Sequence, residues 1–183
     1  MSRIQQIDPA QATGQAKELL DAVQKKMGMV PNMVAAMASS PAFLEGYLGL
    51  SGAVGKNSLS PKLRERIALA VGELNSCDYC LSAHTLIGGK LGLAESEVLA
   101  ARRAEADEPF DAAVLALAKA LVLQRGDLRD EDLRAARDAG LDDGQIADVL
   151  GTVVLNTMTN WFNHVARTAI DFPEVKAGAA AAS

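Results

Sequence analysis

The chain has 183 residues, of which 49% are hydrophobic, only 4% aromatic and 22% charged. A chain of this length buries roughly 70% of the surface that its unfolded form exposes, so one core can hold it without disulfides or metals. The apolar residues are mostly aliphatic and include 33 alanines. Alternating runs of β-branched and aromatic residues, which are typical of strands, are few. We therefore expect a single domain and exclude an all-β fold.

The formal net charge is -5, which provides no uniform basic surface for phosphates, so we expect no nucleic-acid partner. The longest apolar stretch, residues 146–155, is interrupted by Asp148, Gly151 and Thr152. Its runs of consecutive apolar residues are far shorter than the ~20 residues that a membrane span needs, so we expect no membrane partner. The N-terminus has no apolar run typical of a secretory signal, which predicts a cytoplasmic protein in a reducing compartment.

Capping residues and apolar stripes predict a series of helices with short loops. We expect an amphipathic helix over 12–27, short helices after Pro31 and Pro41, and a helix that begins at Ser60-Pro61, where serine caps and proline takes the first position. The remaining predicted helices cover 77–88, 94–103, 110–124, 130–139 and 143–169. Nine segments carry helical signals, and we expect about seven or eight of them to be separate helices of an all-α, single-domain bundle over residues 1–175. The low-complexity tail, 176–183, is predicted to be disordered.

The two cysteines of the chain, Cys77 and Cys80, lie three residues apart at the start of a predicted helix. In a cytosolic protein this spacing indicates redox or metal chemistry more than a structural cross-link. His84 follows Cys80 by four residues, so the two side chains share a helix face. A histidine there can accept the thiol proton or stabilise the thiolate, which is the reactive form of cysteine.

Two physical effects favour different cysteines as the attacking residue. The positive end of the helix dipole favours a thiolate at Cys77, whereas the adjacent imidazole favours Cys80. We prefer Cys80, because a specific base controls both its ionisation and its orientation. The second cysteine can then condense with a sulfenic acid to give a disulfide.

Other interpretations of these residues need to be weighed. Free cysteines are often small buried hydrophobes, and a histidine can be purely structural. Cys77, Cys80, His84 and His164 also make a formal zinc-type set, but three of them would come from successive turns of one helix. We therefore predict no metal and no cofactor.

Glu65 and His164 each allow two interpretations. Glu65 lies at the edge between the apolar stripe and the charged face of the preceding helix. It is either a surface glutamate or a carboxylate that exchanges protons with His84. His164 belongs to the polar and aromatic run 160–164 on the last helix, which either lines a pocket or packs against its neighbours.

The spacing Glu65-x11-Cys77-x2-Cys80-x3-His84 resembles the AhpD-like alkylhydroperoxidases of the carboxymuconolactone decarboxylase superfamily. The flanking segments 30–32, 59–65, 163–166 and 171–173 resemble the peroxidase-related branch, and the resemblance extends over nearly the whole chain, residues 4–173. It implies an all-α fold that assembles into homo-oligomers and an antioxidant, cofactor-free peroxidase.

Carried over by position, the resemblance makes Cys80 the peroxidatic cysteine, Cys77 the resolving cysteine, His84 the base and Glu65 the next member of the proton relay. The expected partners are a hydroperoxide substrate, alkyl or hydrogen peroxide, and a dithiol reductant protein or small thiol. The chain departs from better-known members at Tyr79, where they often carry a histidine. A tyrosine can donate a hydrogen bond but does not act as a base near neutral pH.

Two other functions compete with the thiol-dependent peroxidase. One is a non-catalytic redox sensor or thiol-disulfide exchange module, which would oxidise once and stop without repeated turnover. The other is the decarboxylase-type lyase chemistry that names the superfamily. Decarboxylase members generally lack the cysteine pair, so its presence here counts against that activity.

Overall fold

A computed structural model describes residues 2–178 of the chain, and within this range the protein is built from nine helices. They are α1 (Gly14–Met27), α2 (Asn32–Met37), α3 (Pro41–Val54), α4 (Pro61–Leu74), α5 (Asp78–Lys90), α6 (Glu95–Arg102), α7 (Pro109–Leu123), α8 (Asp130–Asp138) and α9 (Asp143–Ala166). The all-α, single-domain prediction is confirmed. The helix count is slightly higher than the seven or eight predicted, and one of the nine is the six-residue α2.

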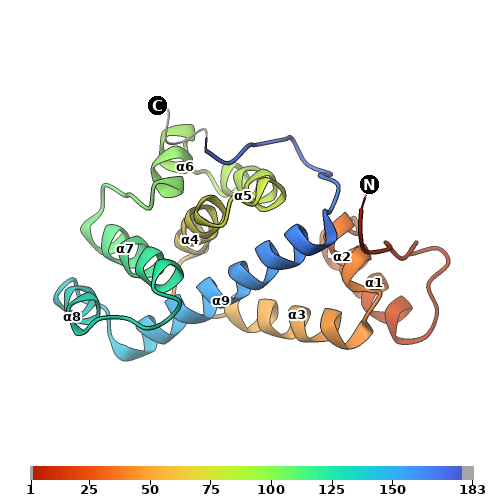
Figure 1. Ribbon diagram of the computed structural model, residues 1–183, viewed down its shortest axis with the longest axis horizontal. Helices are drawn as coiled ribbons and strands as arrows, with labels where there is room; N and C mark the ends of the chain where they lie inside the picture. Colours follow the sequence, from red (N-terminus) through yellow and green to blue (C-terminus); the bar gives the residue numbers. More distant parts are fainter. Residues whose placement is uncertain (1, 179–183) are drawn as a thin grey trace.

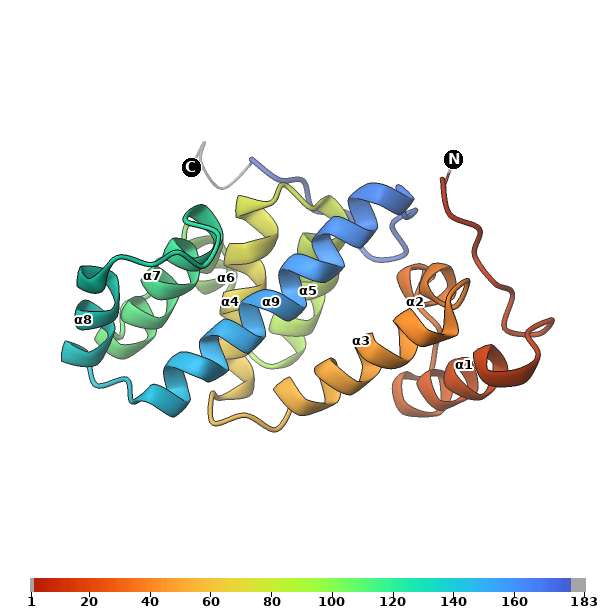
Figure 2. The same cartoon turned by 60° about the horizontal axis from the view of Figure 1, so that its bottom comes forward.

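The helices are arranged around α4 and α9. α4 contacts α5, α6, α7 and α9, and the long α9 runs across the molecule (Figures 1 and 2). α1, α2 and α3 form the N-terminal end, and α6, α7 and α8 lie toward the other end. α5 lies beside α4 and also contacts α9, so its first turn is placed between the centre and the N-terminal helices.

The helix ends follow from local sequence signals. Ser60 accepts a hydrogen bond from the Leu63 backbone N–H, and Pro61 occupies the first turn of α4. At α9, Asp142 and Gln145 form a reciprocal capping box, each accepting from the other's backbone N–H. α9 ends at Ala166, three residues before the predicted end, because Arg167 adopts the left-handed conformation.

The buried residues form three clusters, and the cysteines belong to only one of them. The first joins α4 to α7, α8 and α9, and the third lies between α4, α5 and α6. The second contains Cys77, Tyr79 and Cys80 together with residues of α1, α2 and α3. The cysteine pair is therefore covered by the N-terminal helices and not by the main core.

After α9 the chain returns over α5 (Figure 1). The backbone N–H of Val175 donates to Ser82 Oγ, and that of Ala177 donates to Asp78 Oδ1, each at 2.9 Å. Lys176–Gly178 are thus placed against the helices, and the rest of the predicted tail lies outside the described residues. Among residues 2–178, the helices are too short or too polar for a membrane span.

Candidate active site

The turn between α4 and α5 places the cysteine pair. Ser76 adopts the left-handed conformation with φ of 53°. The N–H of Ser76 donates to Glu73 O, and the N–H of Cys77 donates to Gly72 O, at 2.9 and 2.8 Å. This is the Schellman arrangement that ends a helix, here with serine where glycine is usual. A new helix begins at Asp78, so Cys77 is both the end of the turn and the cap of α5.

Close packing of α4 on α5 fixes their separation. A Cβ added at Gly72 would lie 3.3 Å from Leu81 Cδ2, which is a tight approach. The absence of a side chain at Gly72 therefore lets the two helices meet at Leu81, directly after Cys80. Residues that are far apart in the sequence, on α4 and on α5, can consequently touch.

Cys77 and Cys80 form a disulfide across the first turn of α5, with Cα atoms 5.3 Å apart. Both residues are buried, with exposed fractions of 2% and 3%. The Sγ atom of Cys77 accepts a hydrogen bond from the Cys80 backbone N–H at 3.3 Å. The Sγ atom of Cys80 accepts one from Asn163 Nδ2 at 3.4 Å. The structure thus describes the oxidised form, in which each sulfur has one N–H donor.

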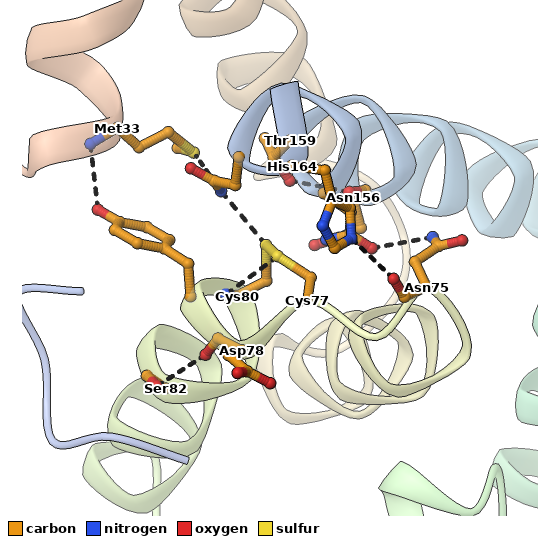
Figure 3. The surroundings of a disulfide bond; sticks show 12 residues. Met33, Asn75, Cys77, Asp78, Cys80, Ser82, Asn156, Thr159 and His164 are labelled. Carbon is orange, nitrogen blue, oxygen red and sulfur yellow. Dashed lines mark hydrogen bonds between the residues drawn. A yellow bond between two sulfur atoms is a disulfide. The ribbon is translucent and has the colours of Figure 1, made fainter. Parts of the chain in front are cut away.

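α9 holds the turn that precedes the disulfide (Figure 3). His164 Nε2 lies 2.8 Å from the carbonyl oxygen of Asn75, so this nitrogen donates. The side chain of Asn75 donates in turn to the buried Asn160 Oδ1 at 2.9 Å. His164 is exposed and is attached to the turn by this contact. Its position indicates that it fixes the turn.

Glu65 and His84 form a partly buried pair. His84 Nδ1 lies 2.7 Å from Glu65 Oε2, and the side chains are 22% and 16% exposed. Burial opposes protonation of the imidazole, but the charge and the hydrogen bond of Glu65 outweigh it, so the pKa of His84 is raised. Because Nδ1 is engaged by Glu65, Nε2 is the nitrogen that remains for proton exchange.

Tyr79 occupies a structural position at the edge of the site. Its hydroxyl accepts a hydrogen bond from the Met33 backbone N–H at 3.2 Å (Figure 3), and its ring packs edge-on against Phe172. Burial raises the pKa of Tyr79, the Met33 N–H lowers it, and the Asp171 carboxylate raises it further. The net direction is upward, so Tyr79 stays neutral and does not replace a histidine as a base.

The structure brings the four predicted site residues onto two adjacent helices. Glu65 contacts His84, and His84 lies one turn beyond Cys80 on α5. Sequence reasoning did not single out Asn163 as the side chain that touches Cys80. The sequence signals were its place in the polar run 160–164 and in segment 163–166 of the family resemblance, and neither links Asn163 to Cys80, which is 83 positions away.

The side chains considered for a zinc site are engaged elsewhere. Cys77 is bonded to Cys80, His84 contacts Glu65, and His164 contacts the Asn75 carbonyl. Between residues 2 and 178 the structure brings together no group of three or more His, Cys, Asp or Glu side chains suited to a metal ion.

A hollow of about 400 Å³ lies on the side of α5 opposite His84. It is lined by Ser82, Thr85, Leu86, Gly89, Lys90, Pro173 and Val175. The lining residues of α5 recur at helical spacing on one face, whereas Cys80 and His84 lie on the opposite face. The hollow therefore does not open onto the disulfide.

Comparison with known proteins agrees with this geometry. The sequence profile described as the carboxymuconolactone decarboxylase family matches residues 41–123, which contain all four predicted site residues. An uncharacterized peroxidase-related protein from Silicibacter sp. TM1040 is 25% identical, with a TM-score of 0.75 over 92% of this chain and 94% of that one. Residues 41–123 thus match the carboxymuconolactone decarboxylase family, and the chain has the fold of AhpD-like, peroxidase-related proteins.

Two further structures share the fold of this chain. The AhpD core of a peroxidase-related protein from Ralstonia eutropha JMP134 is 24% identical, with a TM-score of 0.80 over 93% of this chain and 92% of that one. A debrominase variant in complex with 2,3,4-tribromopyrrole is 17% identical, with a TM-score of 0.78 over the same shares. A comparison with curated proteins gives no match. The superfamily and its neighbours indicate an enzyme of the AhpD type.

Proposed function

We propose that the protein is a thiol-dependent peroxidase that reduces alkyl or hydrogen peroxides. The observation that carries the proposal is the Cys77–Cys80 pair at the start of α5, followed one turn later by a histidine that is bonded to Glu65. A redox-active cysteine needs a group that takes its proton, and a base needs a group that orients it. In this arrangement His84 is the group that takes the proton, and Glu65 is the group that orients His84.

The cycle has three steps, beginning from the reduced protein. His84 takes the thiol proton of Cys80, and the thiolate attacks the terminal oxygen of ROOH. The O–O bond breaks, ROH leaves with the proton returned by His84, and Cys80 becomes a sulfenic acid. The Cys77 thiol then attacks this sulfur, forming the disulfide and releasing water. A dithiol reduces the disulfide by exchange and is itself oxidised to a disulfide.

Cys80 is the proposed attacking residue because two side chains act on it. Asn163 donates to its sulfur, and His84 shares its helix face. Among residues 2–178, Cys77 Sγ accepts only from the backbone N–H of Cys80, within the turn of α5 that Cys77 caps. As the cap, Cys77 is positioned to approach a sulfenic acid at Cys80 from within the same turn.

Access to the disulfide is limited in the oxidised form. The two cysteines are 2% and 3% exposed, and residues of α1, α2 and α3 pack over them. Exchange with a dithiol therefore requires the N-terminal helices to move away from the first turn of α5.

Repeated turnover is the property that tests the proposal. The reduced protein is mixed with excess dithiothreitol and with hydrogen peroxide, cumene hydroperoxide or a brominated pyrrole, and loss of each oxidant is followed over many equivalents. The proposal predicts catalytic consumption of a hydroperoxide, lost in Cys80→Ser. Consumption of one equivalent followed by arrest would instead identify a redox sensor. Turnover of the brominated pyrrole alone would identify a dehalogenating enzyme.

A further inference from the structure

Asn163 carries an unusual set of contacts next to the disulfide. It lies on the last turn of α9 and is 5% exposed. Its Nδ2 atom donates to Cys80 Sγ at 3.4 Å and to Met33 Sδ at 3.2 Å. Its Oδ1 atom is buried and has no hydrogen-bond partner among residues 2–178.

These contacts satisfy the amide poorly in the oxidised protein. Disulfide and thioether sulfurs are weak acceptors, so both hydrogen bonds of Nδ2 are weak. A buried carbonyl oxygen without a donor keeps its desolvation penalty. Buried polar groups in this condition are uncommon, and each calls for an explanation.

Reduction of the disulfide and binding of a hydroperoxide would supply the two partners that the Asn163 amide lacks in the oxidised protein. A thiolate at Cys80 carries a full negative charge at the position that Nδ2 already faces, and hydrogen bonds to charged acceptors are the strong ones. A hydroperoxide placed for attack by this sulfur brings its O–H close to the amide that contacts the sulfur. That O–H is a donor of the kind that Oδ1 is missing.

We propose that Asn163 is a catalytic residue of the peroxidase reaction, with its Nδ2–H donating to the Cys80 thiolate and its Oδ1 accepting the O–H of the incoming hydroperoxide. The second role rests on the proposed peroxidase function. The first depends only on ionisation of Cys80. The two roles are therefore separable by experiment.

Two reagents distinguish the two roles in a Cys77→Ser background, where Cys80 is the single thiol of the chain. Iodoacetamide reports the ionisation of Cys80 without using an O–H, and hydrogen peroxide reports the whole reaction. Rates are measured from pH 4 to 10 for the parent and for Asn163→Ala. Asn156→Ala is the matched control, because Asn156 is an equally buried asparagine of α9 that donates only to its own helix at Thr152 O.

Loss of the donor should move the alkylation midpoint of Asn163→Ala to higher pH. Below both midpoints the alkylation rate should fall by about tenfold to a hundredfold, the usual value of a hydrogen bond to a charged group. Above both midpoints the iodoacetamide rate should match that of the parent, whereas the hydrogen peroxide rate should stay lower. Asn156→Ala should change neither profile.

Asn163→Asp provides a second variant of the same size. It keeps an acceptor but replaces the donor with a negative charge, so its midpoint should rise further while the peroxide-specific loss at high pH is smaller. An unchanged midpoint in both variants overturns the donor role. Equal rate ratios for both reagents above the midpoints overturn the acceptor role. A parent that reacts with iodoacetamide but with no hydroperoxide rejects the peroxidase function, and its alkylation profile still decides the donor role.

Discussion

Replacing Glu65 with glutamine should destabilise the oxidised protein most at pH values where His84 is protonated. The folded state raises the pKa of His84, because the charge and hydrogen bond of Glu65 outweigh the effect of burial. A group whose pKa is raised on folding adds stability that is fully present below its unfolded pKa. This stability is lost as the pH rises through the folded pKa. The Glu65–His84 contribution should therefore be complete below the unfolded histidine pKa of about 6.5 and decline above it.

The size of the effect follows from the contact. The two atoms are 2.7 Å apart and both side chains are less than a third exposed, so solvent screens the pair only partly. In the glutamine variant an ion pair becomes a neutral-acceptor hydrogen bond. We expect a loss of about 2 kcal/mol at pH 6, where both partners are charged, and a smaller loss of about 1 kcal/mol at pH 9, where more of the imidazole is neutral and the bond keeps only the carboxylate charge.

Chemical denaturation at pH 6 and pH 9 measures this difference. Glu73→Gln is the matched control, because Glu73 is also on α4, is 15% exposed, and pairs with Arg102 at 2.8 Å. The guanidinium keeps its charge across this range, so the cost of Glu73→Gln should be the same at both pH values. An equal or larger cost of Glu65→Gln at pH 9 would refute the reasoning about the pair.

Three further predictions concern the surroundings of the site. Ser76→Gly should raise the free energy of unfolding by about 1 kcal/mol, because glycine adopts the left-handed conformation without the steric cost that serine carries. Ser76→Val should lower the free energy of unfolding. A denaturation series that ranks the three proteins in another order contradicts the assignment of this turn. Ser82→Ala removes the acceptor of the Val175 N–H, so hydrogen exchange at Val175 should accelerate while the amides of α7 keep their protection; equal rates in both proteins would show that this bond does not hold the segment. The outward face of α9 carries an exposed apolar patch that includes Trp161, 64% exposed, and Val165, 60% exposed. We propose that this patch contacts a second copy of the chain in the expected homo-oligomer. Trp161→Asp should therefore reduce the mass measured by light scattering, and a mass unchanged from wild type would place the contact elsewhere.

The helices could be predicted because their signals are local. Ser60-Pro61 at the start of α4 and the periodic apolar residues of α7 act within a few positions. The end of α9 was predicted too late, because a left-handed residue after a helix is usually glycine, and the arginine at position 167 does not indicate that conformation.

The site was predictable only where its residues share a helix. Cys80 and His84 are one turn apart, so their spacing alone places them on one face. The contact of His84 with Glu65 depends on how closely α4 packs on α5 at Gly72, which no local pattern encodes. Asn163 reaches Cys80 only through the crossing of α9 over α5, so its role required the tertiary structure.

The position of the sulfenic acid shows which cysteine attacks the hydroperoxide. Reduced Cys77→Ser and Cys80→Ser proteins are treated with one equivalent of hydroperoxide in the presence of dimedone, and the modified residue is located by peptide mass spectrometry. The account predicts a dimedone adduct at Cys80 in Cys77→Ser and no adduct in Cys80→Ser. An adduct at Cys77 in Cys80→Ser, with Cys80 unmodified in the other variant, would contradict it and make the helix-capping cysteine the attacking residue.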